Sequence, residues 1–260
     1  MIFDVGIETV QPNQIKRVIA IPTYYESATV PTLIAELVKD LDQSDAIFVM
    51  DDSPLDAYNL TKSNVLESIK SSKCSLYFLP STHKSGRGAA VRRGMLAAVE
   101  MFPRLEYFLE CDADGSHQAI DINRVLSAQA EFDLVIGSRY LPDSRILGWS
   151  ITRRFFSRVL NFLIPKLFNI PVKDVTNGLR RYSKIAVNEI ISKTPINLGF
   201  TYLTEQALIV CKCRLLVFEV HIEFAERIAG SSSVTWKEVF NSLKGIVNLR
   251  FRTLRVESYE

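Results

Sequence analysis

The sequence has few of the features that mark a disulfide scaffold, a zinc module or a membrane-spanning protein. Only four cysteines occur among 260 residues and none forms a CxxC pair, so neither a disulfide framework nor a zinc site is expected. No stretch reaches the roughly 18 consecutive apolar residues that a spanning helix needs. Residues 1–14 lack the basic and apolar blocks of a signal peptide. These absences predict a cytoplasmic protein that is soluble or attached to a membrane surface.

Charge and phosphate-binding motifs exclude further classes. The chain has 31 Lys and Arg against 29 Asp and Glu, and a net charge of +2 does not indicate a nucleic-acid-binding surface. Neither GxGxxG nor GxxxxGK[ST] occurs, which disfavours a Rossmann dehydrogenase and a P-loop enzyme. With 47% hydrophobic residues, the chain can bury the core of one compact domain with appendages.

Short apolar runs alternate with helical patterns along the chain. Helical spacing of apolar residues is found in Val30–Leu41, Ala89–Met101 and Ile122–Ala130. The order predicts a mostly parallel, doubly wound α/β sheet with ligands at the carboxyl ends of its strands. The runs expected to form buried strands are Arg17–Ile21, Ala46–Met50, Leu76–Leu79, Tyr107–Leu109, Leu134–Ile136 and Leu215–Phe224.

Acidic pairs follow two of these strands. Asp112 and Asp114 are two residues apart, so both carboxylates can face one hard divalent cation, although a solvated loop or a helix N-cap has the same pattern. Asp51 and Asp52 can accept hydrogen bonds from a base or a ribose, but Asp-Ser-Pro also favours a turn. A glycine-rich loop with Gly86 and Arg87 leads into a basic helix whose first amides can hold a phosphate.

Six motifs occur in a characteristic order. They are Ile21–Glu26, Asp51–Pro54, Gly86–Ala90, Asp112–His117, Gly137–Tyr140 and Thr176–Tyr182. Together they resemble the dolichyl-phosphate mannose synthase branch of the family-2 inverting glycosyltransferases, over about residues 18–233. The resemblance implies a GT-A fold at residues 15–233, a Rossmann-like sheet with a C-terminal acceptor part at the membrane interface. An amphipathic helix and a basic tail are expected at residues 234–260.

The resemblance also implies individual roles. Asp112 and Asp114 would bind Mg²⁺ or Mn²⁺, with Ser116 where the family often has glutamine. Arg139, Arg153 and Ser157 would hold the acceptor phosphate, and Asp114, Arg139 and Arg153 would be catalytic. The remaining positions implied to line the nucleotide sugar are Pro22, Tyr24, Glu26, Asp51 or Asp52, Ala113 beside the metal aspartates, and Arg227.

The chemistry of a phosphate acceptor agrees with these residues. A phosphate monoester with a second pKa near ~6 is largely dianionic at neutral pH and needs no protein base to attack a sugar carbon. We therefore expect inverting, metal-dependent transfer of a hexose, with mannose favoured, from GDP-mannose or UDP-glucose to polyprenyl or dolichyl phosphate. Arg153 and Ser157, four residues apart, would share one helix face.

Three alternatives remain open from the sequence. A family-2 enzyme acting on a sugar hydroxyl would need a carboxylate base, for which Glu205 is the candidate. A HAD-type phosphatase shares a strand followed by Asp-x-Asp, but the chain lacks the Gly-Asp-x-x-x-Asp that should follow. An inactive descendant would bind only a nucleotide sugar or a membrane partner.

Two amphipathic segments suggest membrane contact. The first is a candidate interfacial helix at residues 152–164. Around it Ile151, Phe155 and Phe162 recur at helical spacing, with Arg154 and Arg158 on another face. Such a helix lies at a lipid interface or packs in the core with its arginines extended to water. The second segment runs from Trp236 to Val247. We expect a peripheral protein on the cytoplasmic face of a membrane or on an integral-membrane partner.

Overall fold

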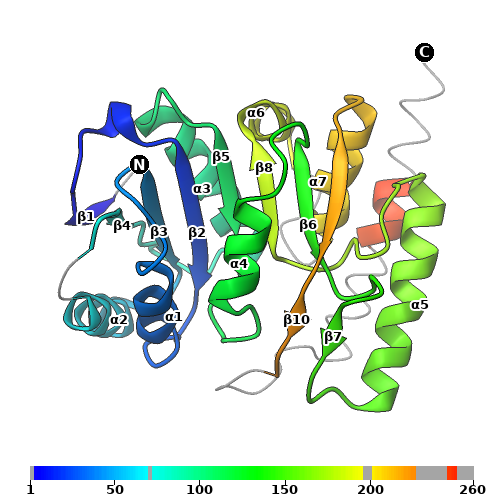
Figure 1. Ribbon diagram of the computed structural model, residues 1–260, viewed down its shortest axis with the longest axis horizontal. Coiled ribbons are helices and arrows are strands. Elements are labelled where there is room, and N and C mark those ends of the chain that lie inside the picture. Colours follow the sequence, from blue (N-terminus) through cyan, green and yellow to red (C-terminus); the bar gives the residue numbers. More distant parts are fainter. Residues whose placement is uncertain (1–2, 70–71, 196–200, 227–244, 251–260) are drawn as a thin grey trace.

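The protein, in a computed structural model, is built on one large sheet (Figure 1). The structure describes residues 3–69, 72–195, 201–226 and 245–250. In these residues eight strands follow the order β1-β4-β3-β2-β5-β8-β6-β9. Only β1 and β8 run antiparallel to their neighbours in this sheet. The strands are β1 (Asp4–Ile7), β2 (Arg17–Thr23), β3 (Asp45–Asp51), β4 (Ser75–Phe78), β5 (Tyr107–Glu110), β6 (Leu134–Ser138), β8 (Arg180–Ser183) and β9 (Val217–His221).

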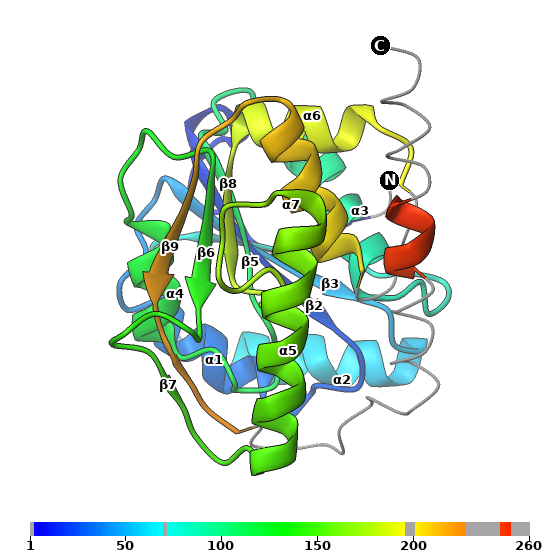
Figure 2. The same ribbon diagram turned by 90° about the vertical axis from the view of Figure 1, so that its right-hand side faces the viewer.

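Helices cover both faces of the sheet (Figure 2). One face carries α1 (Val30–Leu37), α2 (Leu55–Ser68) and α4 (Ala119–Leu126). The other carries α3 (Arg87–Met101), α6 (Lys184–Ser192) and α7 (Tyr202–Lys212). The long helix α5 (Ile151–Phe168) lies beside the β6–β9 end of the sheet. It adds Ile164 and Phe168 to the hydrophobic core on the α3 side. The predicted mostly parallel α/β sheet flanked by helices is confirmed.

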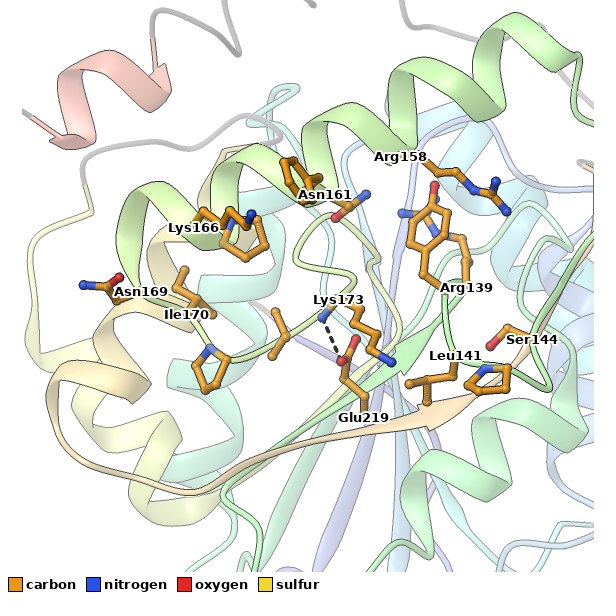
Figure 3. A pocket seen from close by; sticks show the side chains of 16 residues that line it. Arg139, Leu141, Ser144, Arg158, Asn161, Lys166, Asn169, Ile170, Lys173 and Glu219 are labelled. Atoms are coloured by element: carbon orange, nitrogen blue, oxygen red, sulfur yellow. Dashed lines mark hydrogen bonds between the residues drawn. The ribbon is translucent and has the colours of Figure 1, made fainter.

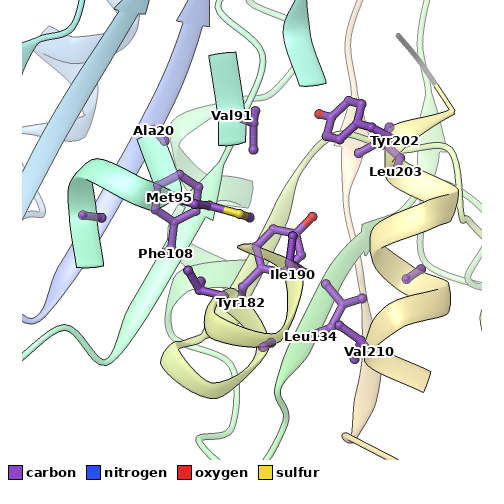
Figure 4. Packing of buried hydrophobic residues seen from close by; sticks show 14 of the residues in the cluster. Ala20, Val91, Met95, Phe108, Leu134, Tyr182, Ile190, Tyr202, Leu203 and Val210 are labelled. Carbon is purple, nitrogen blue, oxygen red and sulfur yellow. The ribbon is translucent and has the colours of Figure 1, made fainter. Parts of the chain in front are cut away.

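The strands form where the sequence has continuous apolar runs. All seven residues of β3 are buried, as expected for a parallel strand covered on both faces. Alternate residues of β2 enter the two cores, with Val18 and Ala20 on the α3 side and Ile19 and Ile21 on the α1 side. Figure 4 shows the core on the α3 side, where Met95 and Phe108 pack near Tyr182.

Two predicted boundaries are wrong. The run Leu215–Phe224, expected as one strand, is β9 followed by β10 (Glu223–Phe224), which pairs with β7 (Arg145–Ile146) in a separate small sheet. The break occurs because β6 ends at Ser138 and offers β9 no partner beyond His221. The helix expected at residues 152–164 is α5 (Ile151–Phe168), which continues through Pro165. The helix tolerates this proline because it stands in the last turn, and Asn169 closes the helix in a left-handed conformation.

The topology fixes where a ligand can bind. From β2 the chain first crosses to β3 on one side and later returns to β5 on the other side. Adjacent loops leave the sheet in opposite directions at such a switch point, and a crevice opens at the carboxyl ends of the two strands. The segments that start at Thr23 and at Asp112 therefore face one another across this edge.

Candidate active site

Unpartnered oxygens gather at the carboxyl edge of the sheet. Among the described residues, seven buried side-chain polar atoms have no hydrogen-bond partner, and three of them are oxygens at this edge. They are Thr23 Oγ1 in the last residue of β2, Asp51 Oδ2 in the last residue of β3 and Ser116 Oγ in the segment after β5. Because buried polar groups nearly always have a partner, three such oxygens at one switch point indicate a ligand-binding position.

The two aspartates at the end of β3, Asp51 and Asp52, differ in their hydrogen bonding. Asp52 is saturated: its Oδ2 accepts from Ser85 N (2.8 Å), Ser85 Oγ (2.7 Å) and Gly86 N (3.2 Å), and its Oδ1 accepts from Arg93 (2.9 Å). Asp51 uses Oδ1 for Ser53 N (2.7 Å) and keeps Oδ2 without a partner. Of the two predicted candidates, Asp51 has the oxygen available for a base or ribose, while Asp52 shapes the glycine-rich loop.

The loop of Asp112 and Asp114 is held by His117. The His117 Nδ1 accepts from Asp112 N (2.9 Å), so the ring proton is on Nε2, which donates to Asn177 Oδ1 (3.0 Å). Asp114 Oδ1 accepts from Ser116 N (3.0 Å). The buried His117 thus holds the acidic loop in place, and its partner Asn177 belongs to the motif Thr176–Tyr182, in which no individual role was expected for it.

The donor set of this loop suits a hard divalent cation. Asp112, Asp114 and the unpartnered Ser116 hydroxyl all supply oxygen. No group of three His, Cys, Asp or Glu with metal-binding geometry occurs among the described residues. Mg²⁺ is commonly held by one or two carboxylates together with waters and substrate phosphate, so two aspartates and one hydroxyl fit that role.

Arg87, predicted to contact the donor phosphate, is engaged by the protein itself. Its Nη1 donates to Glu110 Oε2 (2.8 Å) and to the Tyr202 hydroxyl, its Nη2 donates to the Gly178 carbonyl (3.0 Å), and its Nε lies 2.9 Å from Asp112 Oδ1. A Cβ at Gly178 would lie 2.6 Å from Nη2, so only glycine leaves room for this guanidinium. Arg87 therefore contacts the first aspartate of the predicted metal site.

Glu110 is the centre of a buried network beneath that pair. Its side chain is fully buried and accepts hydrogen bonds from Arg87, Tyr182 and Tyr202. Burial raises the pKa of Glu110, while Arg87 and Arg180 act in the opposite direction. Both tyrosines belong to the apolar cluster shown in Figure 4. The network joins β5, β8, α3 and α7 directly below the acidic loop.

Arg139 is anchored on Asp174. Its Nε and Nη2 each lie 2.7 Å from a different oxygen of that carboxylate, and Nη2 also donates to Thr176 Oγ1 (2.8 Å). The guanidinium is 5.2 Å from the Trp149 ring centroid and 5.3 Å from that of Phe224. A fully buried carboxylate and two rings thus fix the orientation of Arg139.

Arg153 and Ser157 converge on the same place. The Arg153 guanidinium lies 4.0 Å from the Trp149 centroid, and Ser157 Oγ accepts from the Tyr140 hydroxyl (2.7 Å). The three predicted acceptor residues are therefore brought together around Trp149 and Tyr140. No role was expected for these two residues from the sequence, although Tyr140 lies in the motif Gly137–Tyr140 and Trp149 shortly precedes three arginines.

Phe224 connects this cluster to the acidic loop. Its ring is 5.3 Å from the His117 ring and 5.4 Å from the Trp149 ring, both edge-on. The next residue, Ala225, donates to the Ser116 carbonyl (3.1 Å). Only the width of one aromatic side chain therefore separates the predicted metal loop from the predicted acceptor arginines.

The other predicted donor residues lie around the same edge or outside the described residues. Pro22 is in β2, and Tyr24 is exposed with Lys84 Nζ 4.0 Å above its ring. Glu26 Oε2 accepts from Thr29 Oγ1 (2.8 Å), and Ala113 is buried in the acidic loop. Gly86 is the N-cap residue of α3, with a φ of +88° that favours glycine. Arg227 and most of the segment from Trp236 onward lie outside the described residues.

Helix α5 exposes a broad apolar surface. At 100° per residue its large exposed side chains fall within an arc of about 160°. Asn161, Ile164 and Phe168 occupy the opposite, buried side. No described helix is both long and apolar enough to cross a membrane. The exposed residues, 43 to 85% accessible, are Ile151, Phe155, Phe156, Phe162, Leu163 and Leu167.

Comparison with known proteins agrees with this geometry. Residues 18–191 match the model of the family described as glycosyl transferase family 2. The chain belongs to this family. It is a glycosyltransferase, and this membership removes the HAD-type phosphatase interpretation.

Two curated relatives are 28% identical to the chain. One is an undecaprenyl-phosphate mannosyltransferase of Micrococcus luteus, aligned over 83% of this chain and 86% of the relative. The other is a polyprenol monophosphomannose synthase of Mycolicibacterium smegmatis, aligned over 89% and 85%. Both alignments extend beyond the family match and include the acceptor cluster.

Solved structures show the same fold. Glucosyl-3-phosphoglycerate synthase of Mycobacterium tuberculosis, in complex with Mn²⁺, UDP and phosphoglyceric acid, superposes with a TM-score of 0.60 over 90% of this chain and 76% of that one. Its complex with Mg²⁺ and UDP gives the same score over 90% and 77%. At 14% identity the likeness concerns the fold alone. The predicted GT-A fold is confirmed.

Proposed function

We propose that this glycosyltransferase moves a hexose from a nucleotide sugar to polyprenyl phosphate at a membrane surface, with inversion and with a divalent cation. The proposal rests on one contact: the Phe224 ring packs against both His117 of the acidic loop and Trp149, on which Arg139 and Arg153 lie. Donor and acceptor subsites would thus share one wall. The names of the two relatives support the lipid acceptor and favour mannose.

The donor half would be assembled at the switch point. Thr23 Oγ1 and Asp51 Oδ2 are available to the base and ribose of the nucleotide. Asp112, Asp114 and Ser116 would hold Mg²⁺ or Mn²⁺, which when bound neutralises charge on the departing nucleoside diphosphate. Arg87, ion-paired to Asp112, limits the motion of that carboxylate. GDP-mannose and UDP-glucose remain the candidate donors.

The acceptor half would position a nucleophile that needs no base. Arg153 and Arg139 stand over one indole ring, and a dianionic phosphate beside them gains charge-assisted hydrogen bonds. A phosphate oxygen would attack the anomeric carbon from the side opposite the leaving diphosphate, which inverts that centre. Phe224 and Trp149 would keep water from this contact, limiting hydrolysis of the donor.

Peripheral membrane attachment would place the lipid acceptor within reach. The exposed apolar face of α5 is of the kind that enters the boundary between headgroups and acyl chains. Arg153 belongs to the first turn of the same helix. A lipid-linked phosphate at the interface would therefore meet the arginine cluster at the end of α5 that is nearest the acidic loop.

The alternative acceptor, a sugar hydroxyl with Glu205 as base, has less support. Glu205 is 6% exposed, in the first turn of α7. It lines a small cavity with Gly88 and Arg92, on the sheet face opposite α1 and α4. No described contact links it to the arginine cluster.

A transfer assay with the whole chain tests the proposal. Labelled GDP-mannose or UDP-glucose is supplied with a short-chain polyprenyl phosphate or with a free oligosaccharide, and with Mn²⁺, Mg²⁺ or EDTA. We expect label in the lipid fraction only with metal. Metal-independent transfer, or transfer only to the oligosaccharide, would overturn the proposal.

A further inference from the structure

A hollow of about 1020 Å³ opens beside α5 (Figure 3). Its walls are α5, the 139–144 segment, the 169–173 segment and β9, the last strand of the sheet. Of its lining residues, Arg139 belongs to the proposed acceptor subsite and Tyr140 supports that subsite through Ser157. Three further cations, Arg158, Lys166 and Lys173, line the same hollow.

The hollow carries excess positive charge. Arg139 is balanced by Asp174. Glu219, the acid in the lining, accepts from the backbone amides of Lys173 (2.8 Å) and Asp174 (2.9 Å). In the part of the chain that the structure describes, none of the three other cations forms an ion pair: Arg158, Lys166 and Lys173. Three cations against one carboxylate leave a surplus that an anion of one or two charges would complement.

The position of the hollow relates it to the membrane. Arg158 lies at one border of the exposed apolar arc of α5, and Lys166 Nζ is 3.8 Å from the centroid of Phe162 within that arc. When such a face enters a bilayer by about 5–10 Å, Arg158 at its border stands at the level of the headgroup phosphates. Lys166, which lies within the arc, can extend its long side chain to that level. Apolar side chains of Leu141, Pro142 and Ile170 also line the hollow.

We propose that this hollow binds the phosphodiester headgroup of an anionic phospholipid, with Arg158, Lys166 and Lys173 around the phosphate. The site differs from the acceptor position at Arg153 and Ser157, neither of which lines the hollow. Its occupation needs no donor, metal or acceptor. The inference therefore goes beyond the proposed transfer, since it concerns how the protein recognises the membrane that surrounds its acceptor.

Vesicle co-sedimentation tests the proposal without any substrate. The whole chain is mixed with vesicles of phosphatidylcholine alone or of phosphatidylcholine with phosphatidylglycerol. Each cation near an anionic surface contributes about 1 kcal/mol, or roughly fivefold. We expect Lys166→Gln/Lys173→Gln to weaken binding to the mixed vesicles about 25-fold. The matched double variant Lys73→Gln/Arg104→Gln removes two exposed cations elsewhere and should bind like the wild type.

A second control separates a built site from diffuse attraction. Arg145, on β7, is a cation whose side chain is 76% exposed and which does not line the hollow. Arg145→Gln should cost much less than Lys166→Gln. If the two cost the same, or if the double variant loses equal affinity for both vesicle types, the proposal is wrong. Phe156→Ser, which removes apolar area, should instead weaken binding to both vesicle types alike.

The source of the phosphate is tested separately. If inorganic phosphate at millimolar concentration displaces the protein fully from mixed vesicles, the hollow is a free-anion site and the lipid proposal fails. Transfer to a short-chain, water-soluble acceptor should be unchanged in Lys166→Gln/Lys173→Gln. This transfer assay separates the two proposals. If the proposed reaction is wrong, the wild type does not transfer sugar to the lipid phosphate either. If only the headgroup site is wrong, transfer is normal and vesicle binding does not respond to the double substitution.

Discussion

Two arginine sites of this glycosyltransferase contrast in how they are held. Arg87 is surrounded by groups of the folded core, with Glu110, Tyr202 and the Gly178 carbonyl all bonded to its guanidinium. Arg153, on the rim of the protein, stacks on Trp149 at the start of a helix that is largely exposed. The first arrangement fixes a carboxylate in place. The second, in our proposal, binds the acceptor phosphate, so the two arginines differ in their partners: hydrogen-bonding groups around Arg87 and an indole ring beside Arg153.

The largest effect should come from the acidic loop that Arg87 supports. Asp114→Ala removes one of two carboxylates in the predicted metal set, and we expect transfer to fall more than about 10³-fold because leaving-group stabilisation is lost. Initial rates with saturating metal measure this. Asp56→Ala, which changes an acidic residue in the first turn of α2, is the control. Retention of more than a tenth of the wild-type rate in Asp114→Ala would contradict the proposed site.

Breaking the buried network should mainly change stability. Glu110→Leu leaves Arg87 without its buried partner, and we expect a loss of roughly 3 kcal/mol in the free energy of unfolding, measured with urea. Arg87→Leu/Glu110→Leu removes both charges and should recover most of that loss. Glu36→Leu, which breaks the exposed pair with Lys39, should cost less than about 1 kcal/mol. A double variant as unstable as Glu110→Leu would mean that the tyrosine bonds, not the charge pair, hold Glu110.

The difference between the two sites also explains what the sequence could predict. The acidic loop and Arg139 directly follow buried parallel strands, and such strands are visible as continuous apolar runs; β3 agrees with its predicted run to within one residue at each end. The partners of Arg87 were not predictable in this way, since Tyr202 lies 115 residues away in sequence. Only the folded topology brings α7 beneath β5.

Elements with polar sequences were missed for a related reason. Strand β8 reads Arg-Arg-Tyr-Ser, yet Arg180 and Arg181 are buried because they donate to backbone carbonyls, including those of Leu203 and Ala128. Helix α2 buries only Tyr58, Thr61 and Val65 along its length, which is too sparse a stripe for recognition by periodicity. In both cases hydrogen bonding or edge packing, not an apolar pattern, decides the structure.

On the acceptor side a smaller, selective loss is expected. Arg153→Ala should reduce transfer about 10²-fold, since a charge-assisted contact to the acceptor phosphate is worth about 1.5–3 kcal/mol, while nucleotide affinity stays unchanged. Calorimetric titration with nucleotide and Mn²⁺ measures the second quantity. The neighbouring Arg154, which donates to the Ile146 carbonyl, provides the matched control Arg154→Ala. Arg139→Ala is less informative because it also leaves Asp174 buried without its cation.

If Arg153→Ala weakens nucleotide binding as much as it slows transfer, Arg153 belongs to the donor subsite. Arg87 and Arg153 would then both serve the donor side, and the proposed distinction between them would be wrong. A KM increase for the lipid acceptor with little change in nucleotide affinity is the result that the stacked geometry predicts.

The smallest effect concerns the unpartnered oxygens of the donor edge. Thr23 Oγ1 is buried without a partner, so Thr23→Val should leave the free energy of unfolding unchanged or slightly higher. Nucleotide affinity should fall roughly tenfold if that hydroxyl contacts the base or ribose. Thr61 is also buried, but its hydroxyl donates to the Ala57 carbonyl (3.0 Å). Thr61→Val should show the reverse, a stability loss of about 1 kcal/mol with unchanged nucleotide binding. Loss of stability in Thr23→Val without any loss of affinity would show that this oxygen does not face the donor.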